Sequence, residues 1–296
     1  MISKPSLLES IQNGLGRSLG ETIDLNWVRD LSGGDINQAA LIESSDTRWF
    51  VKYRKNAPRG MFEAEASALA EMSASECIRV PKAVAWGEDN NTAWLVLEYL
   101  ELTSSGPASL LGEQLAAMHE VTGDSFGWSH DNYIGTTPQL NRRSEYWVEF
   151  WRDCRLKPQL KMAQAAGYRN RLVDRGDRLL ASLDQLMQDH EPAASLLHGD
   201  LWAGNKAYTS AGQPVIFDPA SYYGDRETDI AMTELFGGFD PEFYAAYQAH
   251  SPLPDGYPLR RDLYKLYHVL NHLNLFGAAY LSRSENIIDG LLAHIH

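Results

Sequence analysis

The sequence predicts an α+β fold of two lobes, a five-stranded antiparallel sheet lobe followed by a mainly helical C-terminal lobe. Three observations point to it. Strand-like segments crowd the first hundred residues, the clearest linker of the chain follows them at 103–107, and helical periodicity dominates the rest. We therefore expect an N-terminal lobe over residues 1–102 and a C-terminal lobe over 103–296.

The N-terminal lobe is expected to begin with an amphipathic helix over 6–20, because apolar residues recur there at helical spacing. The strand-like segments that follow are 23–28, 39–43, 48–53, 80–87 and 92–100. The last of these is a nearly continuous apolar run, which is typical of a buried strand. Gly33 and Gly34 fall between the first two, where glycine lets a backbone lie close to a ligand, although a plain hairpin turn explains them as well.

The most informative stretch is 198–205 together with Asp218. Asp200 and Asn205 are five residues apart, as are the aspartate and asparagine of the kinase catalytic loop, and Asp218 follows a hairpin with its turn at 210–212. A carboxylate can orient an acceptor hydroxyl and take its proton, and carboxylate and amide oxygens suit hard cations. The pattern predicts phosphoryl transfer with Asp200 as base and Asn205 and Asp218 as Mg²⁺ ligands. Each residue taken alone is typical of an ordinary turn.

Two residues of the N-terminal lobe fit the same chemistry. Lys52 ends the third strand, from which a kinase lysine reaches the α- and β-phosphates of ATP. Glu65 lies on the helix that begins near Met61, at the border of its inward face, and an ion pair with Glu65 would fix the lysine; Glu63 is the alternative acid. Solvated charges at a strand end and on a helix face are the simpler interpretation of each residue alone.

The end of the fifth strand is the predicted place for adenine. Backbone groups of Glu98 to Leu100 are available there, just before the linker. Together with Gly33, Gly34, Lys52 and Glu65, they make up the predicted nucleotide-binding residues.

The C-terminal lobe is expected to be helical. The expected helices contain Leu110 to His119, 141–165, 169–189, 230–236, a helix opened by Asp240 and Pro241, 258–280 and 284–294. His119 is expected to be a buried, hydrogen-bonded histidine rather than a catalyst.

Composition limits the partners and the compartment. The formal net charge is −13, from 26 basic and 39 acidic residues, which argues against a nucleic-acid or anionic-membrane partner. Two cysteines form no metal or disulfide motif, and no apolar run has the length of a signal peptide core or a membrane span. We expect a cytoplasmic protein. The oligomeric state is left open.

Several segments resemble the fructosamine-kinase (ketosamine 3-kinase) family, whose relatives include the aminoglycoside and choline kinases. They are 61–65, 198–205, 218–224, 236–239 and the segment from Tyr267 to Phe276. The resemblance covers nearly the full chain and implies a protein-kinase-like fold, ATP and Mg²⁺ as cofactors, and phosphorylation of O3 of a ketosamine, an adduct of a sugar on an amine. The 3-phosphate then tends to eliminate and free the amine, so the implied role is deglycation. The resemblance also implies that Trp202 lines the sugar site and that Asp229 braces the catalytic loop.

Two departures narrow the interpretation. Asp218-Pro219-Ala220 replaces the Asp-Phe-Gly of protein kinases, and no Ala-Pro-Glu follows, which favours a small-molecule kinase without a phosphorylated activation loop. The glycine turn also lacks the cysteine of some family members, so a thiol switch is not supported.

Three hypotheses remain open from the sequence. The first is a ketosamine 3-kinase acting on small ribulosamine- or erythrulosamine-type adducts. The second, an aminoglycoside or choline-type kinase, shares every nucleotide-side residue, and the acidic composition suits its cationic substrates equally well. The third is a nucleotide-binding module without catalysis, against which the intact set of kinase residues argues.

Overall fold

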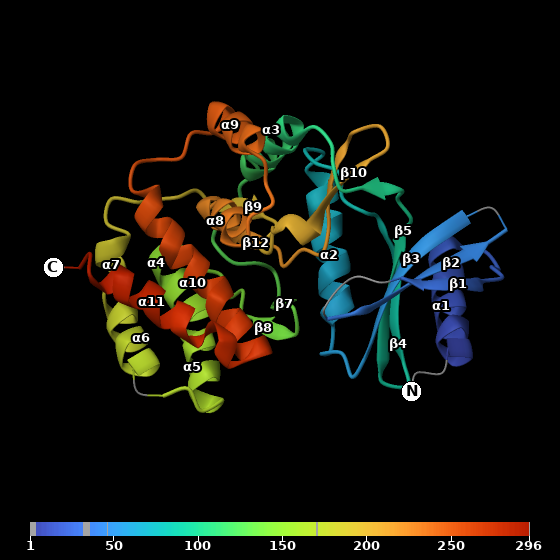
Figure 1. The fold of residues 1–296 in the computed structure, drawn as a ribbon. Helices are drawn as coiled ribbons and strands as arrows, with labels where there is room; N and C mark the ends of the chain where they lie inside the picture. Colours follow the sequence, from blue (N-terminus) through green and yellow to red (C-terminus); the bar gives the residue numbers. More distant parts are fainter. Residues whose placement is uncertain (1–3, 32–35, 46, 170, 296) are drawn as a thin grey trace. The chain divides into compact units, whose positions relative to one another are not determined.

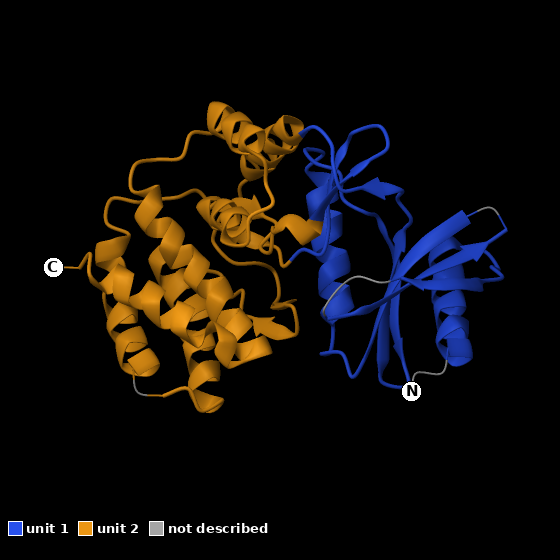
Figure 2. Cartoon of the chain, in the orientation of Figure 1, with its two compact units in different colours: residues 1–107, 206–219 blue, residues 108–205, 220–296 orange. Residues whose placement is uncertain are grey.

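The computed structural model describes residues 4–31, 36–45, 47–169 and 171–295 (Figure 1). The chain divides into two compact units (Figure 2). Unit 1 comprises Met1–Pro107 and Lys206–Pro219, and unit 2 comprises Ala108–Asn205 and Ala220–His296. The predicted lobe boundary after residue 102 thus differs from this division in two ways, since unit 1 runs on to Pro107 and also takes in a segment far along the chain.

Unit 1 contains a five-stranded sheet with the order β1-β2-β3-β5-β4 and antiparallel pairing throughout, as the sequence predicts. Its strands are β1 (Asn26–Leu31), β2 (Gln38–Ser44), β3 (Thr47–Lys55), β4 (Ala83–Asp89) and β5 (Thr92–Glu98). The helices α1 (Lys4–Leu19) and α2 (Met61–Ala74) lie on opposite sides of the sheet (Figure 1).

The alternation of side chains along the strands creates two different faces. On one face, Leu7, Ile11 and Leu15 of α1 pack into a core with Val51 of β3 and Trp94 of β5. That core leaves the opposite face of β3 to α2. The period of the strand therefore decides which residues of β3 can meet α2.

The predicted linker is partly a strand. At its start, β6 (Leu102–Thr103) overlaps it by one residue and pairs with β10 (Lys206–Thr209), which forms the predicted hairpin with β11 (Pro214–Ile216). Gly106 lies so close to the ring of Tyr208 that a Cβ atom there would be 2.3 Å from it. This pairing joins the segment 206–219 to unit 1, together with the bridge between Arg79 and Val215 and the contact of Asp218 with Lys52. A local sequence pattern carries no signal for such distant partners.

Unit 2 is mainly helical. Its α-helices are α3 (Ala108–His119), α4 (Trp147–Phe150), α5 (Lys157–Ala165), α6 (Arg171–Ala181), α7 (Leu183–Leu186), α8 (Glu227–Leu235), α9 (Pro241–His250), α10 (Tyr257–Phe276) and α11 (Leu281–Leu292). The helix α10 packs against α5, α8 and α11, and α3 packs against α9. Two short antiparallel strand pairs also belong to the unit. They are the hairpin of β7 (Asn132–Ile134) with β8 (Thr137–Gln139), and the pair of β9 (Ser195–Leu197) with β12 (Tyr222–Gly224), which are distant in the sequence.

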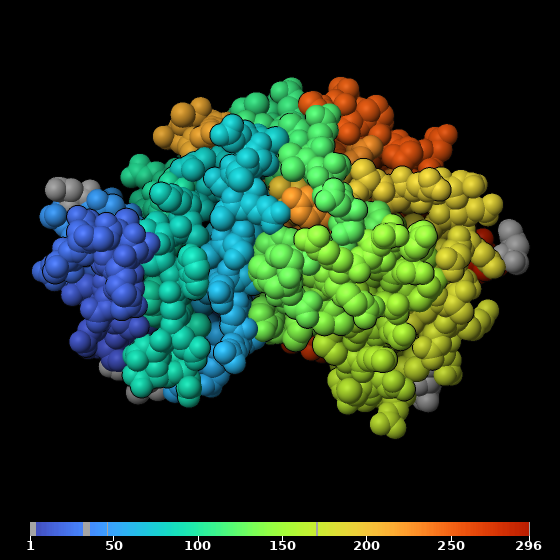
Figure 3. All heavy atoms as spheres, turned by 180° about the vertical axis from the view of Figure 1, so that it is seen from behind, coloured from blue at the N-terminus to red at the C-terminus, as the bar shows by residue number. Residues whose placement is uncertain are grey.

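The expected long helix over 141–165 differs in detail. It begins only at Trp147, and Trp151–Leu156 forms a π-helical turn between α4 and α5. The predicted helix over 169–189 is interrupted at Ser182. In Figure 3 the yellow-green atoms of this part of the chain form part of the surface of unit 2. Phe150 and Trp151 of the same segment are buried. Among the described helices, none is long and apolar enough to cross a membrane.

Candidate active site

Lys52 is turned toward α2 by the alternation of β3. Its neighbours Val51 and Tyr53 face the core under α1, so the side chain of Lys52 points the other way. There its Nζ lies 2.6 Å from Oε1 of Glu65, and both side chains are buried. The structure therefore brings the predicted lysine and acid together, and it places the alternative, Glu63, on the exposed side of the helix.

Asp218 completes this group in unit 1. Its Oδ1 also pairs with Nζ of Lys52, while its side chain remains 41% exposed. The φ angle of Asp218 is 60°, in the left-handed region that residues other than glycine adopt mainly where their surroundings impose it. Burial alone would lower the pKa of Lys52, but the carboxylates of Asp218 and Glu65 raise it above its ordinary value. Lys52 is thus a permanent cation between two acids.

Part of the segment that the sequence predicts to bind adenine already forms hydrogen bonds within unit 1. The amide N–H of Glu98 donates to the carbonyl of Lys82 at 2.9 Å, and its carboxylate accepts hydrogen bonds from Arg79 and from the N–H of Lys82. Leu100 is half-buried. Gly33 and Gly34 lie outside the described residues.

In unit 2 the loop that carries Asp200 begins at the end of β9, and Asp229 of α8 braces its backbone. The carboxylate of Asp229 accepts hydrogen bonds from the N–H groups of His198 and Gly199, at 2.7 and 2.8 Å. Burial would raise the pKa of Asp229, but hydrogen bonds from His119 and the loop backbone, with the nearby histidine charges, hold it below its ordinary value. This contact confirms the bracing role that the resemblance implied.

His119 belongs to the same network. Its Nε2 lies 3.2 Å from Oδ2 of Asp229, and its Nδ1 lies 2.8 Å from the hydroxyl of Tyr247. Both ring nitrogens have partners and the side chain is buried. The prediction of a buried, hydrogen-bonded histidine is confirmed.

Gly199 is required by a close approach of two loops. Its φ angle is +82°, and a Cβ atom there would lie 2.1 Å from the carbonyl oxygen of Ala220. The N–H of Ala220 in turn donates to the carbonyl of His198 at 2.9 Å. The loop before Asp200 is therefore fixed on both sides, by Asp229 and by Ala220.

Asp200 and Asn205 lie at the two ends of the turn that follows. The amide Nδ2 of Asn205 donates to the backbone carbonyl of Asp200 at 2.9 Å, and the N–H of Asp200 donates to Nδ1 of His198. Because the nitrogen of the Asn205 amide is engaged, its oxygen points away from that bond. An oxygen donor held in this way is what a hard cation needs.

Trp202 lies in the same turn and is 38% exposed. Its ring packs over Gly204, where a Cβ atom would lie 2.3 Å from it, and meets the ring of Phe236 edge-on at 6.5 Å between centroids. Phe236 also contacts the ring of His272 at 5.0 Å. An aromatic surface therefore continues from the Asp200 loop onto α10.

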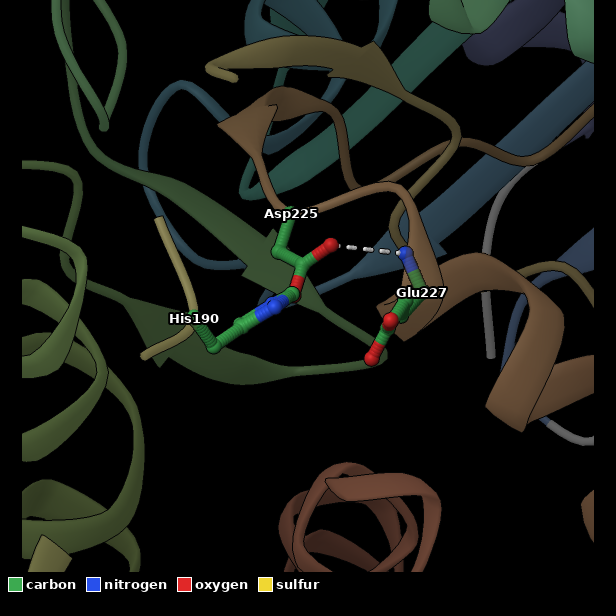
Figure 4. Close-up of side chains that lie close together, drawn as sticks. All are labelled: His190, Asp225 and Glu227. Carbon is green, nitrogen blue, oxygen red and sulfur yellow. Dashed lines mark hydrogen bonds and ion pairs between the residues drawn. The ribbon is translucent and has the colours of Figure 1, made fainter. Parts of the chain in front are cut away.

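One other group of side chains has the composition of a metal site. In the described ranges, His190, Asp225 and Glu227 bring ligand atoms within 4.8 Å of one another (Figure 4). Each already has a partner, since Arg260 forms two hydrogen bonds with Glu227, and His190 and Tyr264 both bond to Asp225. These hydrogen bonds connect the start of α8 to α10. The three side chains are therefore explained by their protein partners, without a bound cation.

The chain matches the family model described as fructosamine kinase over residues 7–294. Among curated proteins it is 39% identical to a probable ketoamine kinase of Synechocystis, over 98% of this chain and 99% of that protein. It is also 39% identical to the chloroplastic protein-ribulosamine 3-kinase of Arabidopsis thaliana, over 92% of this chain and 85% of that protein.

Solved structures give the same picture of the fold. A candidate fructosamine-3-kinase from Haemophilus somnus superposes with a TM-score of 0.89 at 29% identity, over 97% of this chain and 98% of that chain. The choline kinase LicA of Streptococcus pneumoniae superposes with a TM-score of 0.59 at 17% identity, over 98% of this chain and 100% of that chain, a likeness of fold alone. The predicted protein-kinase-like, two-lobed α+β fold is confirmed.

Proposed function

The chain belongs to the fructosamine kinase family and is an ATP-dependent phosphotransferase; from this premise we propose that it phosphorylates O3 of a ketosamine. The observation that carries the proposal is the complete set of kinase residues, Lys52, Glu65 and Asp218 in unit 1 with a braced Asp200 loop in unit 2. Relatives that share nearly the whole chain are named ketoamine and ribulosamine 3-kinases.

ATP is held, in this proposal, mainly by unit 1. Lys52 stays protonated between its two acids, so it offers a fixed positive charge to the α- and β-phosphates. Glu65 fixes the direction of that charge from its buried position on α2. Gly33, Gly34 and the Glu98-to-Leu100 backbone would enclose the rest of the nucleotide.

Asn205 and Asp218 are our proposed Mg²⁺ ligands. Each offers an oxygen of the type that hard cations prefer, and each is positioned by a hydrogen bond or ion pair that leaves a further oxygen for a ligand. When bound, Mg²⁺ neutralises charge on the phosphate oxygens.

Asp200 is the proposed base. The O3 oxygen of the ketosamine forms a bond to the γ-phosphorus, the bond from phosphorus to the β,γ-bridging oxygen breaks, and ADP leaves. The proton of the O3 hydroxyl passes to the carboxylate of Asp200. The bonds from Asp229 to the backbone before Asp200 keep the carboxylate in place without contacting substrate.

Trp202 and the rings beyond it are the proposed substrate surface. An exposed ring beside the base can lie against the apolar face of a sugar or the aliphatic part of the amine, and it attracts a protonated amine through its π face. Small ribulosamine- or erythrulosamine-type adducts are the proposed substrates. Loss of phosphate from the 3-phosphate would then free the amine, so the physiological role is deglycation.

The proposed compartment is the cytoplasm, where a reducing environment suits Cys77 and Cys154, both of which are free thiols. A kinase of aminoglycosides or choline is the alternative. The likeness to such enzymes is one of fold.

The test is release of ADP with and without Mg²⁺ on four acceptors, namely a synthetic ribulosamine of lysine, a fructosamine, an aminoglycoside and choline. We expect Mg²⁺-dependent turnover on the ketosamines alone, with phosphorus NMR placing the new phosphate on O3. Turnover only on the aminoglycoside or on choline would replace the substrate assignment while keeping the catalytic residues. No turnover on any of the four would contradict the proposal.

A further inference from the structure

A buried histidine on α10 faces the proposed base with a ring nitrogen that has no hydrogen-bond partner within the part of the chain that the structure describes. His268 is 3% exposed, and among the described residues nothing hydrogen-bonds to its Nδ1. The carboxylate of Asp200 lies nearby, with its Oδ1 3.9 Å from that nitrogen. Both residues belong to unit 2.

An unsatisfied nitrogen in this position is costly to the fold. A buried polar atom without a partner costs roughly 1–3 kcal/mol, and most buried polar groups avoid that cost. His119, equally buried, has a partner on each ring nitrogen. An apolar side chain would fill the site of His268 without this penalty. The group that its Nδ1 faces, the carboxylate of Asp200, offers a reason for a histidine at this position.

His268 is uncharged at neutral pH. Burial lowers its pKa to about 3, helped by His272 and Arg155 and opposed by Asp229. A neutral imidazole carries one N–H, and a carboxylate oxygen opposite Nδ1 favours the form with the proton on that nitrogen. Such a group can donate to Asp200 but does not neutralise it.

We propose that His268 is a positioning residue for Asp200, donating from Nδ1 to Oδ1 so that the second carboxylate oxygen is directed at the acceptor hydroxyl. This inference rests on the proposed role of Asp200 as base. The distance of 3.9 Å is longer than a hydrogen bond. Catalytic hydrogen bonds are often long before substrate binds, and a rotation of the Asp200 side chain or one bridging water closes this gap.

Three replacements of His268 separate positioning from packing. Asparagine can place an N–H near the site of Nδ1, glutamine reaches toward Nε2 instead, and leucine offers no donor. For His268→Leu we expect kcat to fall about 10- to 100-fold through misplacement of the base, with KM for ATP and ketosamine nearly unchanged. Its Tm should equal or exceed that of the wild type, because the unsatisfied nitrogen is gone.

Rescue is the decisive comparison. His268→Asn should recover most of the kcat lost in His268→Leu, and His268→Gln should not. In an Asp200→Asn background, His268→Leu should cause no further loss, because a positioning residue acts only through its partner. His294→Leu, at an exposed position near the end of the chain, is the matched control and should leave kcat unchanged.

Wild-type kcat in His268→Leu would overturn the inference, as would a fall in Tm together with no rescue by asparagine, which would indicate packing alone. An additive loss in the Asp200→Asn background would also overturn it. The proposed role of Asp200 as base fails in a different way, by turnover persisting in Asp200→Asn itself. The proposed function fails by absence of turnover of the wild-type protein on all four acceptors, so the failures can be told apart.

Discussion

Lys52 in unit 1 contacts two carboxylates through its own side chain, whereas in unit 2 the backbone just before Asp200 is held by the carboxylate of Asp229. In unit 1 the side chains proposed to bind ATP and its Mg²⁺ pair with one another, since Lys52 contacts both Glu65 and Asp218. In unit 2 a buried carboxylate, Asp229, binds the N–H groups just before Asp200 and does no chemistry itself. We therefore expect one replacement in unit 1 to lower both activity and stability. In unit 2 we expect replacements at different residues to lower one or the other.

The largest effect is expected at Lys52. In Lys52→Met, kcat/KM for ATP should fall by about three orders of magnitude, because the fixed charge for the phosphates is lost. The unfolding free energy should fall by about 3 kcal/mol, since Glu65 is left buried without its counter-charge. Steady-state kinetics and urea unfolding measure the two.

A second replacement tests that explanation. Lys52→Met with Glu65→Leu should regain stability but no activity, because an apolar pair removes the buried charge. Glu63→Gln, on the exposed face of the same helix, is the control and should change neither. Full stability in Lys52→Met alone would show that the buried pair does not hold unit 1 together.

Gly199→Ala should damage the loop of unit 2 directly. The added methyl group would meet the carbonyl of Ala220, and the left-handed backbone is unfavourable for alanine. We expect kcat to fall about 100-fold as Asp200 is displaced. Gly212→Ala is a matched control in the hairpin of unit 1, where φ is +80° but the nearest atom lies 3.5 Å away. It should cost about 1 kcal/mol of stability and leave kcat intact.

Asp229→Asn should have the smallest effect of these replacements, and the effect should appear in the unfolding free energy. The new amide group would face the N–H of His198 and lose an acceptor, at a cost of about 2 kcal/mol. The folded pKa of Asp229 lies below 3.8, so its contribution is fully present above that pH and is lost only as pH falls through the folded value. Urea midpoints of wild type and variant should therefore differ by a constant amount between pH 7 and pH 5. A difference that vanishes within this range would contradict the depressed pKa.

Much of this arrangement could be predicted because it depends on residues that are close together in the sequence. The interval from Asp200 to Asn205 lies within one turn, and the strand that contains Lys52 has a clear pattern, although it runs on to Lys55 where the sequence predicted its end near Lys52. Helical spacing was enough to choose Glu65 over Glu63, since it identifies the inward face of α2. The five-stranded sheet followed from the same kind of periodicity.

What could not be predicted depends on distant partners. Lys52 meets Asp218 across 166 residues, and Thr103 of β6 pairs with Tyr208 of β10 across 105 residues. The π-helical turn at Trp151–Leu156 leaves no mark in hydrophobic spacing that distinguishes it from an α-helix. Likewise, helical spacing on α10 places His268 on a buried face but says nothing of the carboxylate opposite it.

The most direct test of the account is Asp200→Asn, assayed for both chemistry and ATP affinity. Mg²⁺-dependent phosphorylation of the ribulosamine of lysine should fall by about three orders of magnitude. The Kd of MgATP, measured by calorimetry on the same protein, should stay within about twofold of the wild-type value, since the groups proposed to bind ATP hold one another in unit 1. Turnover near the wild-type rate would contradict the assignment of Asp200 as base.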